Sequence, residues 1–260
     1  MQVLVAGLGL IGTSLAMDLT ALGHEVVGYD LSSEHCEQAL ALGAIRRTVS
    51  EPRGSFDCIV LATPPEAAIA LLDAPWRAPL WFDTGSVKHA ICDRAKERGL
   101  PFVGGHPLAG NAGSGPAAAQ AGLFAGQGFA LCAAGGPADR AEELVRSLGA
   151  VPYWLDAAEH DRIVALSSHL CYAFSCSLAL LLEDVPGQLV GPAAREMLRV
   201  ATSPTGLWQE ILTLNAPQVA QAGQELAAAL EAAARGDPGT LERARAAANT
   251  IRQGQVGHGG

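Results

Sequence analysis

Short apolar segments alternate with helical patterns over the first 155 residues. The apolar segments are residues 2–6, 25–29, 58–62, 80–83, 101–104, 128–132 and 151–155, and helix-like segments separate most of them. Strands that alternate with helices form βαβ units, which build parallel sheets. The pattern predicts an α/β fold whose N-terminal part, residues 1–155, is a Rossmann-type doubly wound parallel sheet.

The strand-like segments stop near residue 155, and helical patterns follow. A long, largely apolar helix is expected over 158–182, and further helices over 188–201, 204–215, 216–235 and 238–252, with Pro- and Gly-containing breaks between them. We expect an all-α C-terminal domain over 156–252 and a flexible tail over 253–260.

The helix predicted within 163–182 is apolar on nearly all of its sides. Such a helix must be buried on nearly all sides, yet a helical domain of roughly 100 residues has little core of its own. This pattern predicts a homodimer formed through the helical domain.

Composition narrows the classes of function. The chain has 260 residues, a formal net charge of −9 and no Lys/Arg cluster, which argues against a nucleic-acid partner. No uninterrupted apolar run reaches the ~18 residues that span a bilayer, and no basic segment precedes the first apolar run. The six cysteines lack the spacing of a metal site and favour a reducing compartment. We expect a cytoplasmic protein with no membrane partner and no metal.

The segment "GLGLIG" follows the first predicted strand and opens the first predicted helix. It places Gly7, Gly9 and Gly12 in G-x-G-x-x-G spacing, with Leu10 and Ile11 inside the motif. Glycines at these positions allow a tight turn, a close approach of a pyrophosphate to the backbone and close packing of helix on strand. The pattern indicates a dinucleotide cofactor bound at the helix N-terminus.

Asp30 ends the second predicted strand, where a carboxylate can accept hydrogen bonds from the ribose hydroxyls of NAD. No arginine follows within "DLSSEH" to hold a 2′-phosphate, so NAD is favoured over NADP. The alternative is structural: the glycines only make a tight turn, and Asp30 only caps the next helix.

Three further stretches carry polar residues at positions that suit a reaction. In order along the chain they are "DTGSVK" (83–88), "GGHPLAG" (104–110) and "HDRIVALSSHL" (160–170). Ligands of open α/β sheets bind beyond the carboxyl ends of the strands, so the first two stretches should converge beside a nicotinamide. With "GLGLIGTS" and "REMLRVATSPTGLWQEILTLN" (195–215), they resemble the prephenate/arogenate dehydrogenase family of tyrosine biosynthesis.

The resemblance implies oxidative decarboxylation. NAD⁺ takes a hydride from the ring carbon of prephenate, the hydroxyl on that carbon loses its proton, and CO₂ leaves to give 4-hydroxyphenylpyruvate. By resemblance His106 accepts the proton, for which an imidazole of ordinary pKa near 6.5 is suited, and Ser86 hydrogen-bonds the same hydroxyl. His106 could instead only cap a turn, and Ser86 could cap the helix expected near Val87.

The resemblance also implies substrate-binding residues. Arg199 matches the family arginine that pairs with a substrate carboxylate, and His169, Asn111 and Tyr172 are expected to line the same site. Arg199 could instead be a solvated surface residue, and His169 could be structural.

Other positions leave alternatives open. His160 is equally consistent with binding and structure, Asp161 could be only a favourable acid at a helix N-terminus, and Lys88 could assist electrostatically or lie on the surface.

The sequence departs from the family pattern around the substrate side chain. Tyr172 replaces a family histidine, Ala112 stands where relatives often carry an acid, and Glu196 stands where relatives often have Asp. These changes leave arogenate or dual cyclohexadienyl dehydrogenase as alternatives to prephenate dehydrogenase.

Two more distant alternatives remain. A β-hydroxyacid dehydrogenase would use a lysine in its helical domain, but residues 156–234 contain none. A non-catalytic dinucleotide-binding sensor would need only the glycine motif and Asp30.

Overall fold

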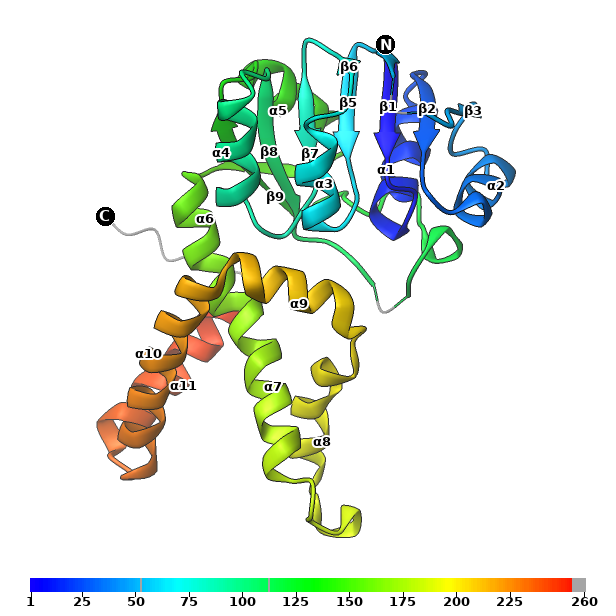
Figure 1. Cartoon of the computed structure of the whole chain (residues 1–260). Coiled ribbons are helices and arrows are strands. Elements are labelled where there is room, and N and C mark those ends of the chain that lie inside the picture. Colours follow the sequence, from blue (N-terminus) through cyan, green and yellow to red (C-terminus); the bar gives the residue numbers. More distant parts are fainter. Residues whose placement is uncertain (52, 112, 254–260) are drawn as a thin grey trace.

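The computed structural model describes residues 1–51, 53–111 and 113–253. Apart from Gln253, the tail expected over 253–260 lies outside the described residues, as does Ala112. The chain forms an upper α/β domain and a lower helical domain, joined through one long helix (Figure 1).

The α/β domain is built on an eight-stranded sheet with the order β10-β9-β8-β7-β5-β1-β2-β3. These strands are β1 (Gln2–Ala6), β2 (Glu25–Tyr29), β3 (Arg47–Thr48), β5 (Cys58–Leu61), β7 (Trp81–Asp83), β8 (Phe102–Pro107), β9 (Gly128–Ala134) and β10 (Val151–Trp154). A separate two-stranded pair joins β4 (Gly54–Ser55) to β6 (Trp76–Arg77). From β1 the chain first adds β2 and β3 on one side and then adds β5, β7 and β8 on the other side, so the sheet is doubly wound. This confirms the predicted fold class.

One junction of the sheet differs from an all-parallel arrangement. β9 runs antiparallel to β8, with His106 opposite Ala130, and β10 then runs parallel to β9. Among the described residues of the connection between β8 and β9 there is no crossover helix, and the helical part seen there is a short 3₁₀ turn at Pro116–Ala118. A parallel pairing requires a crossover, usually an α-helix, so the chain returns in the opposite direction.

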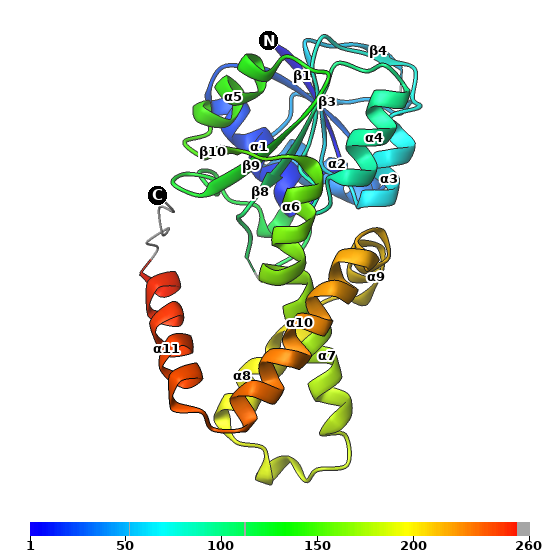
Figure 2. The same ribbon diagram turned by 90° about the vertical axis from the view of Figure 1, so that its left-hand side faces the viewer.

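Helices cover both faces of the sheet (Figure 2). On one face, α1 (Leu10–Ala21), α2 (Ser33–Ala41) and α5 (Ala138–Ser147) pack against one apolar cluster. On the other face, α3 (Pro65–Leu71) and α4 (His89–Glu97) pack against a second cluster, which also takes in Ala157 of the long helix. Both faces of β1 and β5 are buried, which explains why these strands are continuous apolar runs.

The long helix extends from Ala157 to Leu181 without a break. It consists of α6 (Ala157–Val164), a wider π-helical turn (Ala165–His169) and α7 (Leu170–Leu181). By length and composition alone this helix could cross a membrane. The absence of a long uninterrupted apolar run in the sequence did not predict this. However, its N-terminal half carries buried His160 and Asp161, which contact the α/β domain, so it serves here as the link between the domains.

The remaining helices are α8 (Pro192–Leu198), α9 (Thr205–Leu214), α10 (Ala216–Ala234) and α11 (Pro238–Arg252). Figure 1 shows α9 lying just below α3, at the edge where the strands end. The Glu210 carboxylate of α9 accepts a hydrogen bond of 3.0 Å from the backbone amide of Glu66 at the start of α3. The helical domain therefore contacts the α/β domain at the carboxyl edge of the sheet.

Candidate active site

The glycine motif folds as the sequence predicts. Gly7 has φ +95°, and a Cβ there would lie 2.4 Å from the Ala62 carbonyl oxygen. A Cβ on Gly12 would lie 1.8 Å from the Gly7 carbonyl oxygen, so helix α1 can pack on β1 only with glycine at this position. A Cβ on Gly9 would meet no atom within 4 Å, so the space beside this residue is open to a ligand. Gly7 and Gly12 therefore serve the fold, whereas Gly9 faces ligand space.

A cavity of about 580 Å³ opens beside this motif. It is lined by Gly7, Gly9, Asp30, Leu31 and His35, together with Tyr29 and the segment Ala62–Pro64 and the α3 residues Ala67, Ala70 and Leu71. The Asp30 carboxylate is held in place because its Oδ2 accepts the Leu8 amide at 2.7 Å and its Oδ1 accepts the Ser32 amide at 2.8 Å. A fixed carboxylate and an open glycine turn in an apolar cleft fit a nicotinamide dinucleotide at the switch point of the sheet.

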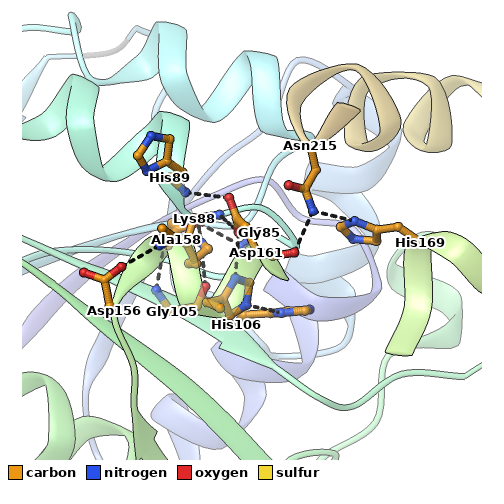
Figure 3. A network of polar contacts seen from close by, with 12 residues as sticks. Gly85, Lys88, His89, Gly105, His106, Asp156, Ala158, Asp161, His169 and Asn215 are labelled. Atoms are coloured by element: carbon orange, nitrogen blue, oxygen red, sulfur yellow. Dashed lines mark hydrogen bonds and ion pairs between the residues drawn. The ribbon is translucent and has the colours of Figure 1, made fainter. Parts of the chain in front are cut away.

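A second set of polar residues meets where the two domains join (Figure 3). His106 lies on β8 next to the carboxyl end, and its Nδ1 is 2.9 Å from Nε2 of His160 on α6. His160 Nδ1 is in turn 2.8 Å from Oδ1 of Asp161. The three side chains form a continuous chain from the α/β domain into the helical domain.

This chain of contacts determines which nitrogen of each ring carries hydrogen. A carboxylate only accepts, so His160 Nδ1 donates to Asp161 and His160 Nε2 is left to accept. His106 Nδ1 must then donate to His160, and His106 Nε2 is left with its lone pair. His106 therefore presents an unprotonated nitrogen that can take a proton, and Asp161 can stabilise the charge that develops along the chain.

The surroundings keep His106 neutral. Burial, the neighbouring His160, the Lys88 ammonium and His169 all lower the pKa of His106, well below the value of 6.5 expected from the sequence. Burial opposes ionisation of Asp161, but hydrogen bonds from His160 and from the Lys88 and His89 amides outweigh it, so the pKa of Asp161 is lowered. A neutral base beside an ionised carboxylate is an arrangement suited to proton abstraction at neutral pH.

Asp161 also connects the two domains through the N-terminus of α4. Its Oδ1 accepts the Lys88 amide at 2.7 Å and its Oδ2 accepts the His89 amide at 2.9 Å. Sequence analysis left open that Ser86 caps this helix, but the N-cap residue is Lys88 and the capping carboxylate comes from α6. The capping role for Ser86 is wrong, because a residue 73 positions away satisfies these amides.

His169 and Tyr172 lie close together beyond the end of α6. His169 Nδ1 accepts a hydrogen bond of 3.0 Å from Nδ2 of Asn215, and the same amide group donates to the Asp161 carbonyl oxygen at 2.9 Å. Burial is the main cause that lowers the pKa of His169, to about 4, so its ring is neutral with hydrogen on Nε2. The Tyr172 ring stacks on Trp208 at 4.2 Å, and burial raises its pKa.

Three residues that the sequence predicted for the site make no hydrogen bond to the residues described above. Arg199 is exposed, and its Nε pairs with Glu196 Oε1 at 3.1 Å. Asn111 is exposed, and both ends of its amide bond the loop itself, through the Ala118 carbonyl and the Gly113 amide. Ser86 is half-buried on the segment between β7 and α4. Their roles toward a substrate stay predictions.

The structure adds four residues that sequence analysis did not assign to the site. His160 and Asp161 complete the chain to His106, Asn215 orients His169, and Lys88 is fully buried rather than on the surface. Each lies in a stretch that the sequence already singled out. His160 and Asp161 are the "HD" of "HDRIV", Asn215 is the last residue of "ILTLN", and Lys88 is the lysine of "DTGSVK". In the described ranges, no group of three or more His, Cys, Asp or Glu side chains is arranged to hold a metal ion.

Fold and site together define a two-domain protein with a dinucleotide-type glycine turn and a hydrogen-bonded chain of His106, His160 and Asp161 where its domains meet. The family models identify the type. Residues 15–151 match the nucleotide-binding domain of prephenate dehydrogenase, and residues 156–236 match its dimerization domain. The chain belongs to the prephenate dehydrogenase family.

Individual relatives agree with this assignment. The chain is 34% identical to the probable prephenate dehydrogenase NovF of Streptomyces niveus, over 83% of this chain and 63% of that protein. The crystal structure of Synechocystis arogenate dehydrogenase is 27% identical with a TM-score of 0.79, covering 98% of this chain and 100% of that one. The prephenate dehydrogenase of A. aeolicus, solved with hydroxyphenyl propionate and NAD⁺, shares the fold with a TM-score of 0.85 at 23% identity, over 97% of this chain and 98% of that one.

The chain spans less than two thirds of the length of the curated relative to which it is 34% identical. Relatives of comparable fold carry names that differ in substrate, prephenate in one case and arogenate in the other.

Proposed function

We propose that the chain is an NAD-dependent prephenate dehydrogenase that oxidatively decarboxylates prephenate to 4-hydroxyphenylpyruvate. The observation that carries the proposal is the hydrogen-bonded chain from Asp161 through His160 to His106, which leaves a basic nitrogen beside the cofactor edge of the sheet. The balanced reaction is prephenate plus NAD⁺ giving 4-hydroxyphenylpyruvate, CO₂ and NADH.

When bound, NAD⁺ would supply the hydride acceptor. Asp30 would hold its ribose hydroxyls, the α1 N-terminus with Gly9, Leu10 and Ile11 would face its pyrophosphate, and Gly7 and Gly12 would shape the turn that makes this possible. The carboxylate at Asp30 disfavours a 2′-phosphate, so NAD is the expected cofactor rather than NADP.

His106 Nε2 would accept the proton of the substrate hydroxyl as the hydride leaves. The imidazolium that forms would be stabilised because His106 Nδ1 donates to His160, which donates to the ionised Asp161. As CO₂ leaves, the electron pair of its bond to the ring makes the ring aromatic, and the proton held on His106 would return to the ring oxygen to give the phenol. Aromatisation drives the reaction forward. Ser86 would hydrogen-bond the same hydroxyl and hold it toward His106.

The remaining predicted residues would bind the substrate away from the reacting carbon. His169 offers an Nε2–H donor from a buried position, and Tyr172 presents a ring held by stacking on Trp208. Arg199 would bind a substrate carboxylate only after exchanging its surface contact with Glu196, and Asn111 would contribute from the loop that follows β8.

The helical domain would pair two chains. It matches the family's dimerization domain, and many of its large apolar side chains are exposed in the single chain. We therefore expect a homodimer formed through this domain, acting in the cytoplasm without nucleic-acid or membrane partners.

A substrate assay with purified protein tests the proposal. NADH absorbance is followed with NAD⁺ and prephenate, and in parallel with NAD⁺ and arogenate, with His106→Asn as the control. We expect turnover of prephenate that is largely lost in the variant. Turnover of arogenate alone would keep the chemistry and reassign the substrate. Binding of NAD⁺ with no turnover of either substrate would contradict the proposal and favour a sensor.

A further inference from the structure

The most deeply buried charged groups of the protein are not part of the proton-accepting chain. The Lys88 side chain is 0% exposed and the Asp83 side chain 1% exposed, and Lys88 Nζ donates to Asp83 Oδ2. A buried ion pair is costly to desolvate and gives weak support for stability by itself. The location of this pair, rather than its energy, indicates what it does.

Both groups hold the peptide that precedes His106. Lys88 Nζ donates to the Gly105 carbonyl oxygen at 2.8 Å, and Asp83 Oδ1 accepts the Gly105 amide at 2.9 Å. Asp83 Oδ2 also accepts the Gly85 amide at 2.9 Å, which ties the turn after β7 to the same pair. The N–H and C=O groups of Gly105 are therefore fixed by the side chains of Asp83 and Lys88. Figure 3 shows Lys88 beside Gly105.

The sheet holds β8 on its β9 side, where the pairing extends to Pro107, but it does not do so on the β7 side. The β7–β8 register pairs Trp81 with Phe102 and Phe82 with Val103, and β7 ends at Asp83. Beyond that point β8 continues to Pro107 without a backbone partner on the β7 side. The Asp83 and Lys88 side chains supply the missing hydrogen bonds, which keep β8 extended up to His106.

The glycine pair before His106 makes room for this arrangement. A Cβ on Gly104 would lie 3.2 Å from Lys88 Cδ and 2.8 Å from Cys92 Sγ, and a Cβ on Gly105 would lie 2.4 Å from the Asp83 carbonyl oxygen. Larger residues would push Lys88 out of position or separate the strands. The two glycines of "GGHP" therefore leave the space that the buried Lys88 side chain occupies, directly before His106.

We propose that Asp83 and Lys88 form a positioning pair, which fixes the Gly105 peptide and thereby directs His106 Nε2 toward the substrate hydroxyl. The proposal rests on the proposed function, in which His106 accepts the proton. Neither residue needs to touch substrate or cofactor, because both act through the backbone of Gly105.

The same lysine acts on His106 through its charge. The titratable groups around the ring are His160 and Asp161 on α6, His169 on the π-helical turn, and Lys88 and Asp83 before α4. The Lys88 cation is among the causes that lower the pKa of His106. Removing this cation therefore shifts the His106 titration, a change that loss of an uncharged structural contact would not produce.

Two variants separate these roles. Asp83→Asn/Lys88→Met removes both charges together, so that no lone charge is left buried. Lys88→Gln keeps a donor for the Gly105 carbonyl but lacks the cation. Lys96→Met is the matched control, because Lys96 lies on the same helix, exposed, and pairs only with Asp93 at the surface.

The variants are compared by kcat, by KM for NAD⁺ and by nitrogen-15 NMR titration of the His106 ring, assigned with His106→Asn. For the double variant we expect kcat to fall about 100-fold, the scale of a misplaced reacting group, with KM for NAD⁺ unchanged. In Lys88→Gln, which removes only the cation, the pKa of His106 rises, so the acid side of the kcat profile moves to higher pH. Lys96→Met leaves all three quantities unchanged.

Several outcomes would overturn the positioning role. One is a folded double variant with wild-type kcat and an unchanged His106 titration. If the double variant does not fold, Lys88→Gln decides alone, and an unchanged His106 titration there overturns the proposal. Should the wild-type protein turn over neither substrate, the proposed function fails, but the NMR titration still tests whether the pair controls His106.

Discussion

The two domains of this chain differ in how completely they bury their own apolar residues. In the α/β domain, Val3–Ala6 of β1 are fully buried, and helices close over both faces of the sheet. In the helical domain, α8 and α11 bury no residue, and α9 and α10 bury one each, Ile211 and Ala222. Leu180 and Leu181 at the end of α7 are 72% and 80% exposed.

This difference shows that the first domain has a complete core within one chain, whereas the second does not. Exposed apolar surface on this scale marks an interaction site, and the match to a dimerization domain identifies its kind. The hydrogen-bonded chain of the proposed reaction lies between the two domains: His106 comes from the α/β domain, and His160 and Asp161 come from the helical domain.

The strongest test of this division removes the contribution of the helical domain to His106. Asp161→Asn deprives His160 of its carboxylate, so the hydrogen positions along the chain are no longer fixed. We expect kcat to fall by about 10³–10⁴-fold, measured by NADH formation with the preferred substrate. Asp156→Asn is the control, since the Asp156 side chain also caps a helix, through the Ala158 amide, and its one contact to His160 is made by the backbone carbonyl, which the substitution keeps. Equal activity in the two variants would show that Asp161 only caps α4.

The next test concerns the exposed apolar side chains of the helical domain. Leu180→Asp/Leu181→Asp places charges at the exposed end of α7, and we expect the dimer dissociation constant to rise about 100-fold or more, from ~1.5–3 kcal/mol for each buried leucine. Sedimentation equilibrium measures it. The control is Leu22→Asp/Leu42→Asp, which changes two leucines of the α/β domain that are each 47% exposed. If the dimer persists in Leu180→Asp/Leu181→Asp but dissociates in Leu22→Asp/Leu42→Asp, the interface lies in the α/β domain and the prediction is wrong.

Within the closed domain, two glycines of one motif should respond differently. Gly12→Ala places a Cβ 1.8 Å from the Gly7 carbonyl oxygen, so we expect it to destabilise the fold by about 1–3 kcal/mol or more. Gly9→Ala meets no protein atom within 4 Å, so we expect an unchanged melting temperature and roughly tenfold weaker NAD⁺ binding, or about 1.4 kcal/mol. Calorimetry measures both. Unaltered NAD⁺ affinity in Gly9→Ala would contradict the assignment of the pyrophosphate site.

The smallest expected effect is the pH dependence of stability near the domain junction. His169 has a pKa of about 4 when folded, mainly because of burial, and about 6.5 when unfolded. The unfolded chain therefore binds more protons between these values, and the free energy of unfolding falls as the pH drops from 6.5 to 4. Urea denaturation should show a shallower fall in His169→Gln than in the exposed control His89→Gln. The same slope in both variants would disprove this link.

Local sequence patterns predicted most of the fold. The alternation of apolar runs and helical periods located the main strands of the large sheet and the five helical stretches after residue 155. The antiparallel direction of β9 was not predicted, because an apolar run has the same pattern whichever way the strand runs. Lys88 was left between two roles, because its burial depends on the distance between β7 and β8 and on Gly104, rather than on its neighbours in sequence.

The sequence by itself determined the glycine turn after β1, since Gly7 and Gly12 act through backbone geometry within a single βαβ unit and Asp30 lies at the end of its second strand. It also located His106, because the residue lies directly at the end of a strand. Only the tertiary structure decided what His106 contacts. His160 is 54 positions away from it, and Asp161 reaches α4 across 73 positions. Periodicity reports only which face of an element is buried, whereas hydrogen-bond partners are chosen when distant elements pack against each other.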